Sequence, residues 1–191
     1  MRSNNKIRIM TFTSMTLILI TIFGTAAYFI AVETAHNVIS TSGVGIALYD
    51  LSDPDGELVP FSKLTNVYPG ETYSKIPYVE NNEVNPVWVR ASVELRAELK
   101  TGETVIIPEY GELVVLNEIG SNWRENDKMY YYEPVLYPGE KTTPFFTSVK
   151  FKEEIPDSFQ DAKFILTVKA EATQTANNGD SALTANWGMG E

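Results

Sequence analysis

The side chains that most often perform catalysis are scarce in this sequence. Its 191 residues include no cysteine and a single histidine, His36. A hydrolytic zinc site needs at least three protein ligands, usually with two histidines one helical turn apart. A Cys-His pair is impossible, and a Ser-His-Asp triad has only His36 available. We therefore predict no catalytic residues, no metal centre and no cofactor, and we expect that the protein is not an enzyme.

One acidic segment has the residue types of a cation site. Residues 50–57, DLSDPDGE, carry four carboxylates at short spacing around a Pro-Asp-Gly turn signal. Carboxylate oxygens at such spacing suit Ca²⁺, although the twelve-residue EF-hand pattern is missing. A solvated acidic turn is the simpler interpretation of the segment. The candidate ligands for a cation are Asp50, Asp53, Asp55 and Glu57.

The first thirty residues have the features of an export signal. Three basic residues lie before position 9, an uncharged apolar stretch follows, and small residues occupy positions 24–27. This order is typical of a signal peptide, because signal peptidase binds an extended segment with small side chains at positions −3 and −1. We expect a signal helix within residues 1–27 that is removed before Tyr28. The residues that define this cleavage site are Thr25, Ala27 and Tyr28.

Two alternatives to this cleavage stay open. A cut after Ala31 is the second choice, because bulky residues lie just upstream of it. Residues 9–31 also approach the length of about 20 apolar residues that spans a bilayer, so the segment could remain as an uncleaved anchor. In either case we expect contact with a membrane only through this segment.

The charge of the chain limits its partners. Three of the 15 Lys and Arg residues lie before position 9, and all 25 Asp and Glu residues lie after position 32. The exported part therefore carries 12 basic against 25 acidic residues, a net charge of −13. Nucleic-acid binding needs a basic face and is not expected. A cysteine-free chain of about 160 exported residues can bury a stable core without disulfides, which favours a Gram-positive cell surface.

Alternating apolar residues predict an all-β fold after the signal. In residues 86–99, seven apolar side chains fall on one face, while Trp88 and the polar side chains fall on the other. Short strands with Pro and Gly turns indicate a β-sandwich or barrel in a single domain over residues 43–191. Further strands are expected at 43–51, through Ile76 and Val79, and at 105–107, 112–119, 129–140, 145–152 and 163–175. A polar loop is expected at 122–127, a helical turn within 153–162, and a short strand or a tail after 182.

One turn motif occurs twice. VYPGET at 67–72 and LYPGEK at 136–141 share Tyr-Pro-Gly-Glu, and each precedes a strand. Pro followed by Gly supplies the fixed φ and the positive φ of a type II turn. The repeat indicates either a duplicated binding loop or a turn geometry used twice, and we favour the geometry.

Three segments share a pattern with a known family. They are GTAAYF followed by HNVISTSGVGIALYD (24–50), YPGETYSKIPYVENNEVNPVWVRASVEL (68–95), and LTVKAEATQTANN (166–178) with Trp187. Together they resemble the TasA/camelysin group of exported Gram-positive proteins. The group combines a Gly-Thr-x-Ala-Tyr-Phe signal, a Pro-Gly and Lys stretch ending in x-Val-x-Asn, and a late Glu-Ala-x-Gln strand. One departure is Ile30-Ala31, where the group often has Ser-Asp.

The resemblance carries expectations about fold, location and role. It implies a jelly-roll-like antiparallel β-sandwich and export through the SipW-type signal peptide of this group. It also implies a structural subunit of surface or biofilm-matrix fibres, outside a Gram-positive cell. In such fibres the mature N-terminal segment pairs with the sheet of the next subunit, and the added strand satisfies the backbone groups of an exposed sheet edge. The partners would be further copies of the chain and components of the matrix or cell surface.

Residues 28–42 are the segment on which the hypotheses differ. The segment is a donor strand for the next subunit, a flexible leader, or an edge strand of its own domain. A monomeric cell-surface binding module is the alternative function, with residues 53–57 or the two Tyr-Pro-Gly-Glu turns as its binding loops. A secreted metallopeptidase of the camelysin type is the third hypothesis. It is disfavoured because His36 is the only histidine of the chain, whereas a zinc site needs at least three protein ligands.

Overall fold

The structure, a computed structural model, describes residues 37–38, 45–53, 55–61 and 67–188. The predicted signal segment 1–27 and most of the leader 28–42 lie outside these residues. Within the described ranges, no helix is long and apolar enough to cross a membrane.

The described fold is all-β, as predicted. Its sheets are antiparallel except for one short parallel pair, β1 with β12. Two 3₁₀ turns, η1 (Tyr110–Glu112) and η2 (Asp157–Phe159), interrupt the strands. The strands are β1 (Asn37–Val38), β2 (Ile46–Ser52), β3 (Val59–Pro60), β4 (Thr72–Ser74), β5 (Ile76–Asn81), β6 (Val87–Glu98), β7 (Thr104–Ile107), β8 (Val114–Asn117), β9 (Trp123–Asn126), β10 (Met129–Leu136), β11 (Ser148–Phe151) and β12 (Lys163–Gln174).

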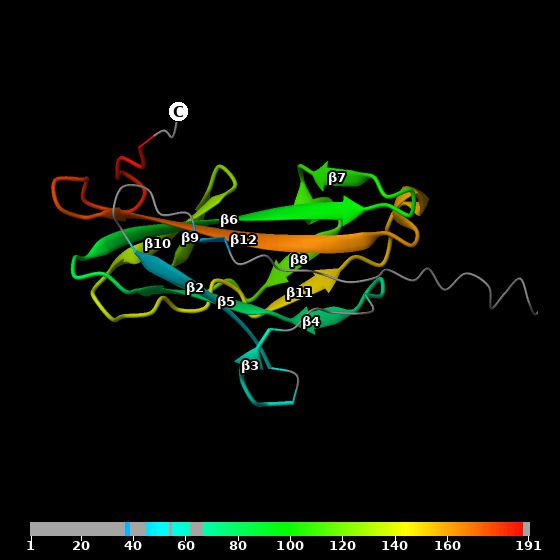
Figure 1. The fold of residues 1–191 in the computed structure, drawn as a ribbon, viewed down its shortest axis with the longest axis horizontal. Coiled ribbons are helices and arrows are strands. Elements are labelled where there is room, and N and C mark those ends of the chain that lie inside the picture. The colour runs from blue at the N-terminus through cyan, green and yellow to red at the C-terminus, as the bar shows by residue number, and fades with distance from the viewer. Residues whose placement is uncertain (1–36, 39–44, 54, 62–66, 189–191) are drawn as a thin grey trace, which may run out of the picture.

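The two longest strands organise the first sheet. Its order is β1-β12-β6-β10-β9, with β7 also paired to β6. All twelve residues of β12 pair with β6 in one unbroken antiparallel register, from Lys163 opposite Glu98 to Gln174 opposite Val87. Figure 1 shows these two strands running side by side along the length of the fold. Both have period-two alternation over more than ten residues, which is why they form the central pair of the sheet.

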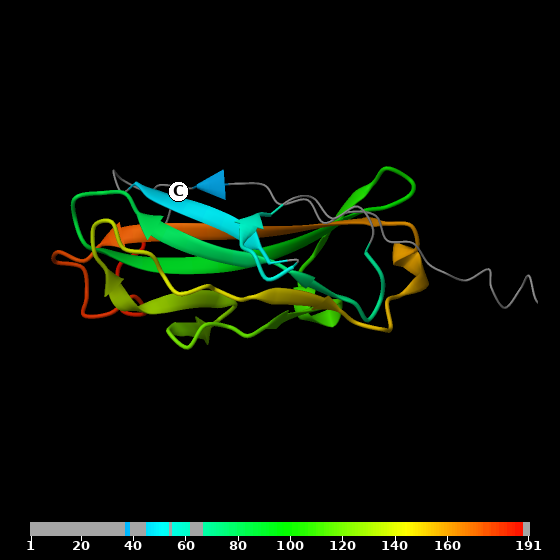
Figure 2. The same cartoon turned by 90° about the horizontal axis from the view of Figure 1, so that it is seen from below.

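Two three-stranded sheets face the first one. Their orders are β3-β2-β5 and β4-β11-β8, and the chain passes from β4 to β5 through the single residue Lys75. Residues 140–145 run beside β5, where Thr142 N donates to Val79 O at 2.8 Å and Phe145 N donates to Pro77 O at 2.8 Å. These contacts join the two small sheets into a second layer, so the architecture is sandwich-like (Figure 2).

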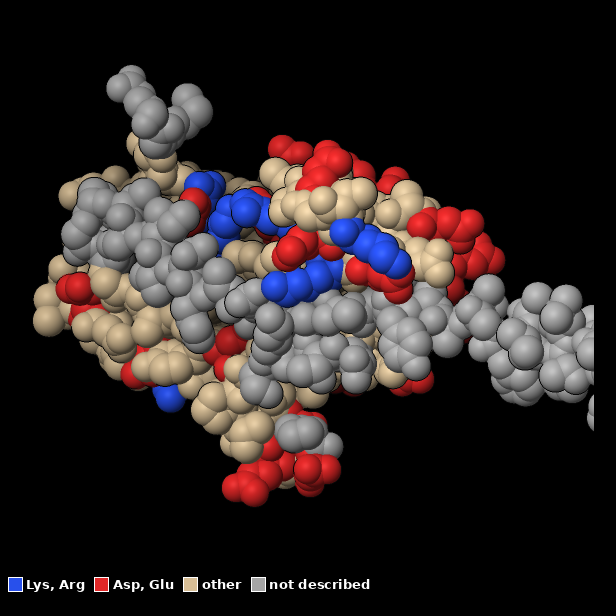
Figure 3. All heavy atoms as spheres, turned by 45° about the vertical axis from the view of Figure 1, so that its right-hand side comes forward, with Lys and Arg blue, Asp and Glu red and all other residues tan. Residues whose placement is uncertain are grey.

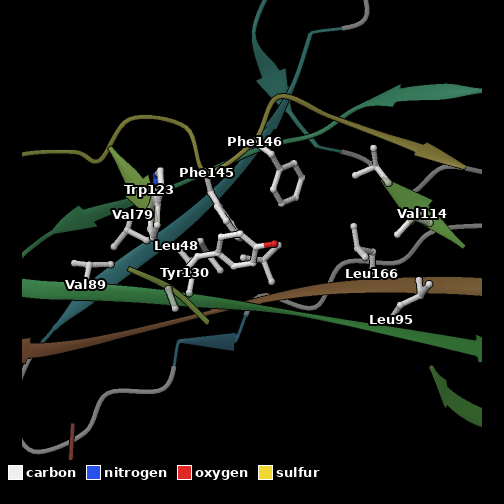
Figure 4. Packing of buried hydrophobic residues seen from close by; sticks show 14 of the residues in the cluster. Leu48, Val79, Val89, Leu95, Val114, Trp123, Tyr130, Phe145, Phe146 and Leu166 are labelled. Atoms are coloured by element: carbon white, nitrogen blue, oxygen red, sulfur yellow. The ribbon is translucent and has the colours of Figure 1, made fainter. Parts of the chain in front are cut away.

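One hydrophobic core lies between the layers (Figure 4). Alternation in residues 86–99 predicts five of its seven inward side chains correctly, because Val87, Val89, Ala91, Leu95 and Ala97 are buried. Val93 and Leu99 are only partly buried, and Trp88, which was expected on the face of the polar side chains, is 6% exposed. A group of aromatic residues also packs inside. Phe145 is the centre of their cluster, with ring centroids 4.7 Å from Tyr130, 5.0 Å from Trp123 and 5.1 Å from Phe146.

The prediction of a polar loop at 122–127 is wrong. Residues 123–126 form β9, which pairs with β10 in a hairpin. Asp127 and Lys128 have φ values of 51° and 63°, which fit a two-residue turn with positive φ at both positions. The sequence looked like a loop because three of the four strand residues are exposed, and only Trp123 reaches the core.

Other expected elements are present with shifted ends. The helical turn in 153–162 is confirmed as η2. The strand expected at 112–119 is shorter, because η1 occupies its first residue and β8 begins at Val114. After residue 182, the described residues up to 188 contain no strand.

Both Tyr-Pro-Gly-Glu segments form the same kind of turn. Gly70 and Gly139 have φ values of 81° and 76°. Residues with a side chain rarely adopt positive φ, so glycine is favoured at both positions. In each turn the Glu amide donates to the Tyr carbonyl three residues earlier, at 3.3 Å for Glu71 and 3.0 Å for Glu140. The repeat therefore has a geometric explanation, as we favoured.

Candidate functional site

The outer edge of β12 is where the leader meets the domain. Among the described residues, the register gives Lys169 the partner Asn37 and gives Ala170 the partner Val38, in parallel orientation. The strand alternation of β12 places Phe164, Leu166, Val168, Ala170 and Ala172 in the core. Its backbone is therefore held rigidly along one side by β6 and along one face by the core. A rigid strand of this kind can template the pairing of a second segment along its other side.

The described part of the leader pairs with its own domain. The three hypotheses for residues 28–42 are a donor strand, a flexible leader and an edge strand of the same domain. In a single copy of the chain, Asn37 and Val38 form an edge strand of their own domain. A permanent edge strand and a donor strand folded back onto its own subunit would both form this pairing. Within one chain, β12 is the strand with which the described residues of the leader pair.

Ion pairs cover the outer face of β6 and β12. Arg90 Nε lies 2.5 Å from Glu171 Oε2, its cross-strand partner, and Lys163 Nζ lies 3.6 Å from Glu98 Oε2. Glu94 lies between them and accepts hydrogen bonds from Lys169 at 3.2 Å and Arg96 at 2.5 Å. Figure 3 shows basic and acidic side chains interleaved on this side of the molecule.

The ion pairs have a local electrostatic consequence at Glu94. Desolvation acts to raise its pKa, but the hydrogen bonds from Lys169 and Arg96 outweigh it and hold the pKa below its ordinary value. The carboxylate therefore stays charged at neutral pH.

The C-terminal tail packs over the same sheet. Trp187 Nε1 donates to Ala182 O at 2.9 Å, and the Arg90 guanidinium lies 4.5 Å from the centroid of the Trp187 ring. Tyr131 meets the same indole edge-on, with ring centroids 6.2 Å apart. This cation–π and aromatic contact anchors the tail, and it gives Trp187 a packing role next to the β6–β12 pair.

The candidate cation ligands occupy different environments. Asp53, Asp55 and Glu57 are exposed on the loop between β2 and β3, which projects from the body of the fold in Figure 1. Asp50 points away from them, because Lys75 Nζ donates to its Oδ2 inside the fold. In the parts of the chain that the structure describes, no group of three or more His, Cys, Asp or Glu side chains is placed to hold a metal ion. Calcium binding at this segment stays a prediction.

The residues of the export signal cannot be placed in the same way. Thr25, Ala27 and Tyr28 of the predicted cleavage site lie outside the described residues, and so does His36. Cleavage before Tyr28 is therefore a prediction that rests on the sequence pattern alone.

Sequence reasoning missed the pair formed by Asp50 and Lys75, although a signal for it was present. Ile46 and Leu48 are buried on β2, and continuing that alternation puts Asp50 on the same face. On the neighbouring segment, Lys75, Pro77, Val79 and Asn81 form the buried face. The sequence instead predicted a strand through Ile76 and Val79, which lie on opposite faces of β5. This choice did not show that the side chain of Lys75 points toward the core.

Comparison of the chain with protein-family models, curated proteins and solved structures gave no match. The likeness to the TasA/camelysin group thus stays an expectation based on the three sequence segments.

Proposed function

We propose that this protein is an exported structural protein, a subunit of an extracellular-matrix or cell-surface fibre that assembles by strand addition. The observation that carries the proposal is the parallel pairing of β1 with the edge of β12. A segment that follows a predicted cleavage site lies on the rim of a sheet, where a second chain can replace it.

The energetics of this contact favour exchange between subunits. The described pairing covers two residues of β1, and each backbone hydrogen bond contributes about 1 kcal/mol net. The described part of the leader is therefore held only weakly to its own subunit. The same contacts form when the leader of one copy pairs with β12 of the next, and residues on both sides of β1 extend that pairing in the fibre.

The same proposal includes a jelly-roll arrangement of the two layers and removal of the signal segment before Tyr28. The sandwich-like, antiparallel architecture is compatible with a jelly roll. Removal of the signal leaves residues 28–42 as an N-terminal leader, so that maturation would release the donor strand outside the cell. The proposed location is the matrix or surface of a Gram-positive bacterium, which rests on the sequence resemblance.

Deletion of residues 28–42 from the mature protein tests the role of the leader. We expect the full mature chain to form fibres in electron micrographs and the deletion variant to remain monomeric in sedimentation. Circular dichroism of the variant should retain the β signal, because the deleted segment contributes only β1 to the described sheets. Fibres formed by the deletion variant at the same concentration would overturn strand addition by this segment.

A cysteine pair distinguishes pairing within a subunit from pairing between subunits. Asn37→Cys and Lys169→Cys place two thiols at directly paired positions in a chain that has no other cysteine. Cα atoms of paired strands lie within the range that a disulfide bridges. Oxidised fibres should give a ladder of covalent oligomers on a non-reducing gel, whereas exclusively intramolecular disulfides in fibres would contradict donation.

A monomeric binding module is the second candidate. The observation that favours it is the projection of the β2–β3 loop, which exposes acidic side chains away from the sheets (Figure 3). This function predicts a chain that stays monomeric at high concentration and binds a ligand saturably. Replacing Asp53, Asp55 and Glu57 together would abolish that binding and leave the sheets intact.

A further inference from the structure

The second layer contains a pair of oppositely charged side chains inside the fold. Lys75 Nζ donates to Asp50 Oδ2, and the two side chains are 2% and 9% exposed. By contrast, the outer-face pair of Arg90 and Glu171 is 21% and 27% exposed. Burial of two charges costs several kcal/mol each, and their attraction repays this only when the remaining polar atoms are also satisfied.

The remaining polar atoms of this pair are poorly satisfied. Asp50 Oδ1 is buried and has no hydrogen-bond partner among the described residues. On the other side of the pair, the Phe61 ring centroid lies 4.4 Å from Lys75 Nζ. Desolvation lowers the pKa of Lys75, because it outweighs the opposing effect of Asp50. Burial therefore disfavours the charged form of the Lys75 amine.

Backbone contacts on both sides hold the two groups together. The Cα of Asp50 is paired with that of Pro77 in the β2–β5 ladder, two residues from Lys75. Asp50 O accepts from Phe61 N at 2.9 Å, and Lys75 N donates to Thr147 O at 3.2 Å. The amine and the carboxyl are thus fixed against each other by three neighbouring segments, which raises their effective concentration far above that of free reactants.

We infer that Lys75 and Asp50 become joined by an amide bond between Nζ and Cγ. Transfer of a proton within the pair gives an amine and a carboxylic acid. The nitrogen lone pair attacks Cγ, the C–OH bond breaks, and the nitrogen gives up a proton to the departing hydroxyl, which leaves as water. The ammonium and the carboxylate together contain every atom of the amide and the water, so no oxidant or co-reactant is needed.

The bond would tie the start of the fold to its middle. Asp50 lies on β2, the first strand after the leader, and Lys75 lies where the chain passes between β4 and β5. The cross-link closes a loop that includes β3 and prevents β2 from separating from β5. A pull on the N-terminal leader would then be transmitted through a covalent bond, and this inference stands whether or not the protein forms fibres.

Intact-mass spectrometry of the purified full chain tests the inference. We expect a mass lower than that of the sequence by one water molecule. Glutamyl endopeptidase cuts after Glu57 and Glu71, which lie between the two residues in sequence. It should release a branched species in which the peptide containing Asp50 is joined to the non-adjacent peptide containing Lys75.

The control variant is Lys75→Met, which keeps the aliphatic stem and removes the amine. Its mass should equal that of its sequence, with no branched peptide. This control matters because Asp55-Gly56 can also lose water by closing a succinimide ring, and that loss would persist in Lys75→Met. The inference is overturned if the protein without substitutions has the full mass of its sequence. It is also overturned if Lys75→Met shows the same loss of water.

Discussion

Asn81 is fully buried and uses its side chain to hold two backbone segments. Its Nδ2 donates to Asn85 O at 2.9 Å and to Leu136 O at 3.0 Å, while its Oδ1 accepts from Glu83 N at 2.9 Å. The asparagine thus closes the connection from β5 to β6 and ties it to the end of β10. An amide side chain suits this position, because it supplies two donated hydrogen bonds and one accepted hydrogen bond.

We expect Asn81→Leu to lower the free energy of unfolding by about 3 kcal/mol, because three hydrogen bonds are lost and the Leu136 carbonyl stays buried without this donor. Urea denaturation measures the loss. The neighbouring Asn82 is exposed, so Asn82→Ala is the control and should change stability by less than about 0.5 kcal/mol. Equal stability of the two variants would show that the Asn81 side chain does not hold these segments.

Tyr130 and Tyr110 form a second buried polar contact. Their hydroxyl oxygens are 2.6 Å apart, and Tyr130 is 3% exposed. Desolvation, followed by the hydrogen bond with Tyr110, raises the pKa of the Tyr130 hydroxyl above its ordinary value. The folded state therefore keeps a proton that the unfolded state loses near about pH 10.

The sign of this linkage predicts an alkaline loss of stability. The contribution of Tyr130 is fully present below about pH 10 and declines as pH rises above that value, where only the unfolded state ionises. Tyr130→Phe should cost about 1 kcal/mol at neutral pH and should flatten the decline in stability above pH 10, as measured by urea denaturation at several pH values. Tyr137→Phe, at a side chain that is 55% exposed, should leave the curve unchanged. A curve for Tyr130→Phe as steep as that of the original chain would contradict the assignment.

At the scale of elements, the β12 strand has two different sides. Its pairing with β6 is long and continuous, whereas its described pairing with β1 is short and parallel. Parallel pairing of segments that are distant in sequence has no local turn to set its register. Among the described residues, the β1 contact is the shortest pairing of the first sheet.

A proline in β1 tests whether the backbone of this element carries the assembly. Val38→Pro removes one backbone donor, worth about 1 kcal/mol per contact between subunits. The protein concentration needed for fibre formation should therefore rise about fivefold, as measured by sedimentation of assembled protein. Val38→Thr keeps the N–H and the branched side chain and should assemble like the original chain. Equal critical concentrations for both variants would place the assembly contact elsewhere.

At the scale of the whole molecule, net charge opposes any assembly of copies. Residues 28–191 carry 12 basic and 25 acidic residues. Subunits of like charge repel one another over a distance of about 10 Å at 0.1 M salt, and this range shortens as salt increases. The strand addition that we propose would have to overcome this repulsion, so ionic strength would control assembly.

We expect fibre growth to accelerate between low and physiological salt, because screening reduces repulsion without weakening backbone hydrogen bonds. Light scattering at a fixed protein concentration and increasing sodium chloride measures the rate. Sucrose at matched osmolality is the control for effects that do not depend on charge. Growth that slows as salt increases would indicate that attraction between opposite charges, rather than strand pairing, drives association.

The sequence by itself determined the kind of fold and the inward faces of its long strands. Period-two alternation is a local property, because successive side chains of a strand point to opposite sides whatever the partner strand is. This is why residues 86–99 and 163–175 were assigned correctly, together with most of their core side chains. Turn chemistry is also local, so the two Tyr-Pro-Gly-Glu segments were interpretable without a structure.

Only the tertiary structure decided which elements meet. The pairing of β1 with β12 joins residues more than a hundred positions apart, and no local pattern encodes a partner at that distance. The Asp50 and Lys75 pair depends in the same way on the register between β2 and the β4–β5 junction. Alternation could have placed each of these side chains inward, but their contact exists because sheet formation brings two separately encoded inward positions together.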